Sequence, residues 1–247
     1  MRFRLVDASE RRLSAVPRLA IVVLAVSLSV QIAWQAVAPP PVGRAAALEP
    51  PPPETWLRVA SFGDAIAASQ MLVLYLQAFD NQPGVSVPYR DLDYDAVLAW
   101  LKTALALDPA GQYPLMMASH LYARVPDQTK ARRMLDFVHR EFLRDPERRW
   151  RWLAHAAIVA KHRLNDMPLA LRYAEDIARH ANQARSWARQ MRIFILEDMG
   201  ETQAAAVLLG GLLAGGEVTD PAEIRFLTER LEQLKSDEKS SSSSKFR

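Results

Sequence analysis

The longest uncharged stretch of the chain lies near its N-terminus, where residues 19–38 are apolar apart from two serines and two glutamines. Twenty residues of α-helix span about 30 Å, which matches the thickness of the hydrocarbon core of a bilayer. Trp34 lies near the far end of the stretch, where an indole ring favours the membrane interface. The pattern therefore predicts one transmembrane helix over residues 19–38.

Basic residues are distributed unequally on the two sides of this predicted helix. Five arginines lie within residues 1–18, whereas Arg44 is the one basic residue between the helix and Arg58. Because the basic flank of a membrane helix stays in the cytoplasm, we expect residues 1–18 in the cytoplasm and the rest of the chain outside it.

A cleaved signal peptide is the alternative to an anchor, since residues 36–38 and 45–47 both resemble cleavage sites made of small residues. Pro39 directly follows the first of these sites, and the apolar stretch is longer than the core of a usual signal peptide. Both observations favour an uncleaved anchor, and both alternatives place the remainder of the chain on the same side.

Two segments have the composition of a linker and a tail. Residues 39–56 contain seven prolines, which favour an extended and semi-rigid spacer. Residues 236–247 are rich in serine and charge, and we expect them to be disordered.

Between these segments, residues 57–235 have the apolar spacing of helices, with no strand alternation or hairpin signal. A second apolar stretch, residues 60–79, could be a second span that returns the chain to the cytoplasm. Asp64, Ser69 and Gln70 interrupt it, so we expect a buried core helix instead.

A repeat pattern is the strongest signal in this region. Residues 94–109 read YDAVLAWLKTALALDP, in which Asp108 can cap a following helix and Pro109 can take its first position. The segment resembles the second helix of a tetratricopeptide repeat. A small residue near the start of that helix recurs at spacings of 34, 39 and 34, and 34 is the period of the family. These positions are Val97, Ala131, Ala170 and Ala204.

The expected first helices of the repeats fit the family in part. Two sets of residues follow its spacing of large, small and aromatic positions: Leu115, Ala118, Ser119 and Tyr122, then Trp150, Leu153, Ala154 and Ala157. The third repeat lacks a closing proline, residues 81–90 form an insertion, and four glycines weaken the last helix. The resemblance implies an all-α, tetratricopeptide-like solenoid of about four helix pairs over residues 57–235, and a nonrepetitive helical bundle is the alternative.

Residues that could support chemistry are few. The chain contains no cysteine, which excludes disulfides, thiolate metal sites and a cysteine nucleophile. It has no phosphate-binding loop or nucleophile elbow. His155, His162 and Asp166 could form a zinc site, but a solvated helix face explains them as well. We therefore expect no enzymatic activity, no metal and no cofactor.

Charge is concentrated in the centre of the region. Residues 124–192 hold 16 basic and 8 acidic side chains, between flanks that are net acidic. A basic centre can select an anionic partner, although a solvated face without a partner has the same composition. The expected location outside the cytoplasm argues against nucleic acid. Residues 148–152 (RRWRW) alternate arginine with tryptophan, and the repeat spacing buries Trp150, which leaves its neighbours free to bind.

The resemblance also implies a binding surface, because the first helices of such repeats line a groove. The residues expected there are Tyr113, Met116, His120, Arg148, Arg151, His155 and Arg189. Arginine suits carboxylates and tyrosine suits apolar side chains, so we expect an acidic or C-terminal peptide as the ligand.

These features together predict a scaffold or assembly factor in a bacterial inner membrane, with its repeat domain in the periplasm and a protein or peptide partner. An accessory subunit of a membrane complex is the first alternative, and a histidine-dependent metal protein or enzyme is a weaker one. The oligomeric state is left open.

The first testable prediction concerns topology. Alkaline phosphatase fused after Lys235 should be active, because this enzyme folds only outside the cytoplasm, and green fluorescent protein exported at the same position should be dark. The opposite pair of results would reverse the orientation and favour a second span over residues 60–79.

Overall fold

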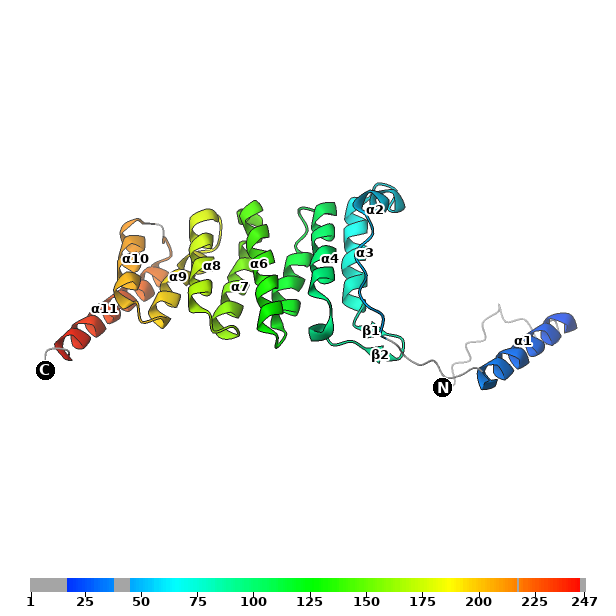
Figure 1. Ribbon diagram of the computed structural model, residues 1–247. Helices are drawn as coiled ribbons and strands as arrows, with labels where there is room; N and C mark the ends of the chain where they lie inside the picture. Colours follow the sequence, from blue (N-terminus) through cyan, green and yellow to red (C-terminus); the bar gives the residue numbers. More distant parts are fainter. Residues whose placement is uncertain (1–16, 38–44, 217, 245–247) are drawn as a thin grey trace, which may run out of the picture. The chain divides into compact units, whose positions relative to one another are not determined.

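The computed structural model describes residues 17–37, 45–216 and 218–244, and the chain divides into two compact units (Figure 1). The first unit, Met1–Arg44, contributes one described helix, and the second, Ala45–Arg247, contributes all the others. Most of the described residues are helical and very few are in strands, so the expected all-α class is confirmed.

The elements follow one another with short connections. In chain order they are α1 (Arg18–Val37), α2 (Glu54–Ala60), α3 (Ala65–Ala78), β1 (Asn81–Gln82), β2 (Val85–Ser86), η2 (Tyr89–Asp91), α4 (Tyr94–Leu107), α5 (Tyr113–Met116), η3 (Met117–Leu121), η4 (Tyr122–Arg124), α6 (Gln128–Arg144), α7 (Pro146–His162), α8 (Met167–His180), α9 (Ser186–Asp198), α10 (Thr202–Ala214) and α11 (Pro221–Ser244). The two-residue strands β1 and β2 form an antiparallel hairpin, which the sequence did not predict. Gly84 closes its turn with φ 78°, a value that favours glycine.

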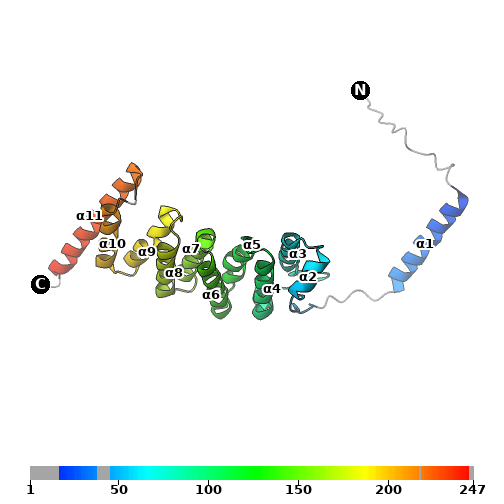
Figure 2. The same ribbon diagram turned by 90° about the horizontal axis from the view of Figure 1, so that it is seen from above.

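Within the second unit, each helix packs mainly against its neighbours in the sequence. Seen from above, α4, α6 and α8 form one row and α3, α5 and α7 form the other (Figure 2). Contacts also join members of one row, as between α4 and α6 and between α5 and α7. The first helices of the expected repeats therefore lie side by side in one layer.

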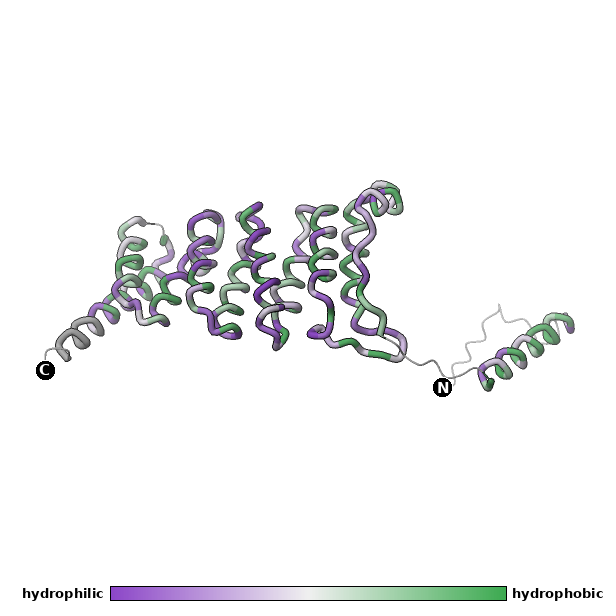
Figure 3. Tube along the Cα trace, in the orientation of Figure 1, coloured by the Kyte–Doolittle hydropathy of each residue, from purple (hydrophilic) through white to green (hydrophobic). Residues whose placement is uncertain are grey.

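The helix α1 has the length and composition of a membrane span. It is the one unbroken helix in the described residues that is long and apolar enough to cross a bilayer, and none of its side chains is buried. Figure 3 shows it as hydrophobic along most of its length. The predicted span 19–38 is shifted by one residue at its start, and Ala38 lies outside the described residues, as does the expected cytoplasmic segment up to residue 16.

The apolar stretch 60–79, which could have been a second span, contains helix α3, and one side of this helix packs into the core. Leu72 and Leu76 of α3 are buried, and Ser69 Oγ donates a hydrogen bond to the Ala104 carbonyl of α4 at 2.8 Å. The pair α2 and α3 is apolar enough to pass as one broken span, but it bends by 109°. This packing against α4 agrees with the expected core helix.

Small residues occupy the helix interfaces where the sequence placed them, except in the last pair. Val97, Ala131 and Ala170 have exposed fractions of 2% or less. Ala204, by contrast, is exposed, and the neighbouring Ala205 is fully buried. The prediction for Ala204 is therefore wrong by one residue, because a run of three alanines does not reveal which of them faces the core.

The expected linker 39–56 also needs correction, since its second half belongs to the folded unit. Leu48 is buried, and the Glu49 carbonyl accepts a hydrogen bond from Trp100 Nε1 at 2.7 Å. Helix α2 then begins at Glu54, three residues before the predicted domain boundary. Prolines keep this segment extended, and one leucine and one carbonyl suffice to fix it on α4.

The expected disorder is wrong for residues 236–244, because α11 continues to Ser244, and residues 245–247 lie outside the described residues. Leu227 and Leu234 are buried in a second apolar cluster, and this packing holds the first part of the helix in place. Once a helix has formed, each added residue costs little, and the lysine and glutamate that follow are good helix formers.

Burial of Leu105 gives a stability test for the helical register. Its exposed fraction is 5%, so Leu105→Ala should lower the free energy of unfolding of a fragment 45–244 by about 2–5 kcal/mol. Leu143 on α6 is 48% exposed and serves as the control, because Leu143→Ala should change it by about 0.5 kcal/mol or less. Chemical denaturation measures both, and equal losses would contradict this packing.

Candidate partner-binding surface

The first helix of the second pair is irregular. It begins as an α-helical turn at α5, widens into a π-helical turn at η3 and ends as the 3₁₀ turn η4. The buried Ser119 lies in the π-helical turn, and its Oγ donates a hydrogen bond to the Leu115 carbonyl at 2.9 Å. A serine that bonds the backbone of the preceding turn bends helices, and π-turns recur at functional sites. This turn carries His120, one of the predicted groove residues.

His120 and His155, which the sequence placed at equivalent positions of neighbouring repeats, lie against each other. Their rings stack with centroids 3.5 Å apart and planes 12° apart. The ring of Trp152 meets His120 edge-on at 5.8 Å. Because His155 and Trp152 belong to α7 and His120 belongs to η3, these three rings join two first helices.

The pKa values of both histidines lie below the ordinary value of an imidazole. Burial lowers the pKa of His155 to about 4, with further lowering by His120 and Arg124, while the hydrogen bond that His155 donates to the backbone of Ser119 raises the pKa. Burial also lowers the pKa of His120, and Arg124 adds to this effect. Two neutral imidazoles can stack without charge repulsion. Nε2 of His155 is buried and has no hydrogen-bond partner in the described part of the chain.

The contacts of the histidine pair give no support to the zinc site of His155, His162 and Asp166. Within residues 17–37, 45–216 and 218–244, no three histidines or carboxylates come together as a metal site. Asp166 pairs with Arg132 at 2.6 Å and caps α8 by accepting from the Leu169 amide, so it takes no part in a site with His155. Ser119 Oγ also lies 3.1 Å from His120 Nδ1, but the serine is fully buried and donates its proton to a carbonyl, which excludes it as a nucleophile.

The tyrosine and methionine of the predicted groove have different surroundings. Tyr113 is 54% exposed and lines a pocket of about 200 Å³ between α3 and α5. Gln112 also lines this pocket, and its Oε1 accepts a hydrogen bond from Trp152 Nε1 at 2.6 Å. Met116 is partly buried against the core, so it offers less surface than predicted.

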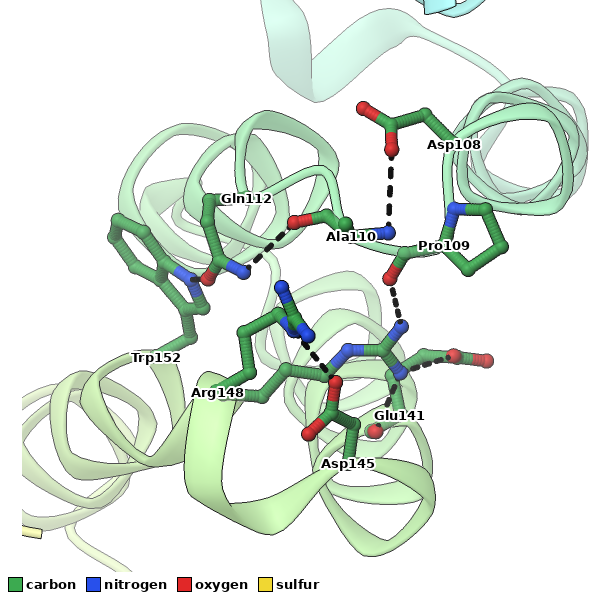
Figure 4. A network of polar contacts seen from close by, with 9 residues as sticks. Asp108, Pro109, Ala110, Gln112, Glu141, Asp145, Arg148 and Trp152 are labelled. Atoms are coloured by element: carbon green, nitrogen blue, oxygen red, sulfur yellow. Dashed lines mark hydrogen bonds and ion pairs between the residues drawn. The ribbon is translucent and has the colours of Figure 1, made fainter. Parts of the chain in front are cut away.

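Three arginines in four positions at the start of α7 have three different roles. Arg148 is exposed and its Nε donates to Asp145 Oδ2 at 2.8 Å (Figure 4). The guanidinium of Arg151 lies over the ring of Trp150 at 5.7 Å. Both side chains reach solvent, as predicted for groove residues.

Arg149, in contrast, is buried, with an exposed fraction of 4%. Its Nη1 donates to the carbonyl and the carboxylate of Glu141, at 2.7 and 3.0 Å, and its Nη2 donates to the Pro109 carbonyl at 2.9 Å. It therefore links α7 to the C-terminal part of α6 and to the turn between α4 and α5. The prediction that both neighbours of Trp150 are free to bind is wrong for Arg149.

The last predicted residue, Arg189, is half-buried on α9. Two positions before it, Trp187 is 48% exposed, and its ring meets Trp150 edge-on at 5.7 Å. The sequence analysis missed Trp187 and Gln112 as members of this surface. The spacing of 37 residues between the two tryptophans, close to one repeat, was the available signal for Trp187.

Comparison with protein-family models, with curated proteins and with solved structures gives no match to this chain. The resemblance to tetratricopeptide repeats therefore rests on the residues of the sequence. The function has to be argued from the surface just described.

The contrast between Arg148 and Arg149 generates the third prediction. Arg149→Met removes the buried partner of Glu141, whose carboxylate is left with the exposed Arg144 at 2.7 Å, and should lower the free energy of unfolding by about 3 kcal/mol or more. Arg148→Met breaks an exposed ion pair and should cost about 1 kcal/mol or less. Denaturation of the fragment 45–244 measures both changes. Similar losses in the two variants would contradict the buried role of Arg149, whereas partial recovery in Arg149→Met with Glu141→Met would support it.

Proposed function

We propose that this protein is a membrane-anchored scaffold or assembly factor of the bacterial envelope, in which tetratricopeptide-like repeats bind a protein or peptide partner outside the cytoplasm. The helix α1 supplies the anchor, and the arginine asymmetry around it supports the orientation. The layer of first helices α5, α7 and α9 supplies the binding surface.

The observation that supports the repeats best is the spacing of polar contacts between neighbouring helix pairs. Arg132 bonds Asp166, 34 residues away, and Gln190 bonds Glu223, 33 residues away. The Asn182 amide donates to Glu147 Oε1, 35 residues before it. Contacts that recur near one period are typical of stacked repeats, in which each unit touches only its neighbours.

The chemistry of the first-helix layer favours a peptide with carboxylates. Arg148 and Arg151 stand one turn apart on α7, the helix that also carries His155, and present two guanidinium groups. An exposed pair such as Arg148–Asp145 is worth about 1 kcal/mol or less, so a partner's carboxylate can compete for the arginine. Tyr113 and its pocket offer a place for an apolar side chain.

A permanent accessory subunit of a membrane complex is the second candidate. The observation in its favour is the apolar outer face of α2 and α3, which an obligate partner could cover. A scaffold should remain folded and monodisperse when it is purified alone, whereas an orphaned subunit should aggregate. Light scattering of the purified full-length chain separates these two candidates.

Charge reversal tests the proposed surface. A tagged full-length chain with Arg148→Glu and Arg151→Glu should recover its partner from detergent-solubilised membranes at least about tenfold less well, because the reversed charges repel carboxylates. Helical content and melting temperature should stay within a few degrees of the wild type.

The matched control lies in the other helix layer, on α8. Arg179 pairs with Asp176 three residues before it, as Arg148 pairs with Asp145, and Arg172 lies over Tyr173 as Arg151 lies over Trp150. Reversing Arg172 and Arg179 should leave recovery unchanged. Equal recovery in the two double variants would remove the first-helix layer as the binding surface, while the anchored repeats would remain.

A further inference from the structure

The first helix pair exposes an apolar face that nothing in the described chain covers. Helix α3 contains no charged residue. Its outward side and the neighbouring α2 carry large apolar side chains that are at least half exposed: Trp56, Val59, Phe62, Ile66, Met71, Leu74 and Tyr75. We call this set the α2–α3 face. Monomeric soluble proteins rarely leave such a contiguous patch in water, so it marks a contact surface.

The corner between α2 and α3 places one aromatic ring entirely in solvent. Phe62 is fully exposed and has φ 53°, in the left-handed region that a phenylalanine rarely adopts. Gly63 follows with φ 86°, and Asp64 then caps α3 by accepting from the Ala67 amide. A strained residue that gains no burial within its own chain points to an outside contact.

The charged groups near this face leave its apolar side chains unobstructed. Glu54 and Arg58 of α2 pair with each other at 2.8 Å. Asp64 is engaged in the cap of α3. Tryptophan and phenylalanine prefer the boundary between lipid headgroups and acyl chains, where a neutral apolar face gains most.

The few residues between α1 and the second unit limit how far the α2–α3 face can lie from the end of α1. Helix α1 ends at Val37 and the second unit begins at Ala45. Seven residues, even fully extended, span at most about 25 Å. The Ala46 amide bonds Gln82 just after α3, so Ala45 lies about one length of α3 from Phe62. Helix α3 has 14 residues and is about 21 Å long, which is less than the span of the seven residues, so the corner at Phe62 can reach the surface from which α1 emerges. If α1 spans a bilayer, lipid is permanently available at this distance.

We infer that the α2–α3 face docks on the lipid surface from which the anchor emerges, with Trp56, Val59 and Phe62 inserted at the headgroup boundary. This inference goes beyond the proposed partner binding, and it rests on α1 spanning the membrane. The tether makes the contact intramolecular in effect, so a few buried side chains suffice to hold it. Docking at this end leaves the first-helix layer of the later pairs free for a partner.

The absence of cysteine allows a direct test on the full-length chain in phospholipid nanodiscs. Single cysteines replace Ala67, Ala204 or Ala25, and each is labelled with a nitroxide. Ala67 and Ala204 are both exposed alanines at the third position of a helix, α3 and α10, so they form a matched pair. Ala25 lies in α1 and reports on the anchor. Collisions with oxygen detect lipid, and collisions with a water-soluble nickel chelate detect water.

The label at position 67 should collide more with oxygen and less with nickel than the label at position 204, and the label at position 25, deeper in the bilayer, should collide most with oxygen. Adding Trp56→Ser and Phe62→Ser should move position 67 towards water, since each aromatic side chain contributes about tenfold to docking.

Water exposure at position 67 with lipid exposure at position 25 would overturn docking and leave the anchor intact. Shielding of position 67 from both reagents would also overturn it, because a second copy or a protein partner would then cover the face. Water exposure at position 25 would remove the anchor and docking together.

Discussion

Close approach at small side chains is the constraint on which the second unit depends. Ala118, Ala154 and Ala174 are at most 1% exposed, and a larger side chain at any of them would push neighbouring helices apart. Since a single helix pair cannot bury its apolar faces alone, each pair relies on the next one in the row. The same approach brings two first helices near enough for His120 to stack on His155, so the candidate site follows from the packing.

A stack of this kind has two ends, and they differ in this chain. At the C-terminal end, α11 covers the last pair, and Leu227 and Leu234 are buried against it. At the N-terminal end, α3 packs on α4 with one side and leaves Met71 and Leu74 more than half exposed on the other. Terminal repeats need a polar outer face to stay in water. The open end is also the end that follows α1 in the chain.

Much of this fold could be predicted from the sequence, because burial at small residues leaves a periodic trace. Val97, Ala131 and Ala170 are buried as their spacing indicates. Prediction failed where the composition of a segment does not indicate its structure. Leu48 fixes a proline-rich segment that has the composition of a linker, and α11 extends into a serine-rich tail. Spacing also paired His120 with His155, but it carried no sign of the π-helical turn around Ser119.

The start of α7 shows why a surface is harder to predict than a core. Arg148 and Arg149 are adjacent and chemically identical, yet one lies in solvent beside Asp145 and the other is buried against Glu141. Successive side chains of an α-helix point about 100° apart, so one can be exposed for binding while the next is buried in a structural role. The repeat spacing identified Trp150 as a core residue, and a helical turn places its predecessor at the edge of the same buried side. The arginines of a charge-rich helix therefore have to be sorted by the side of the helix on which they lie before any of them is assigned to a partner.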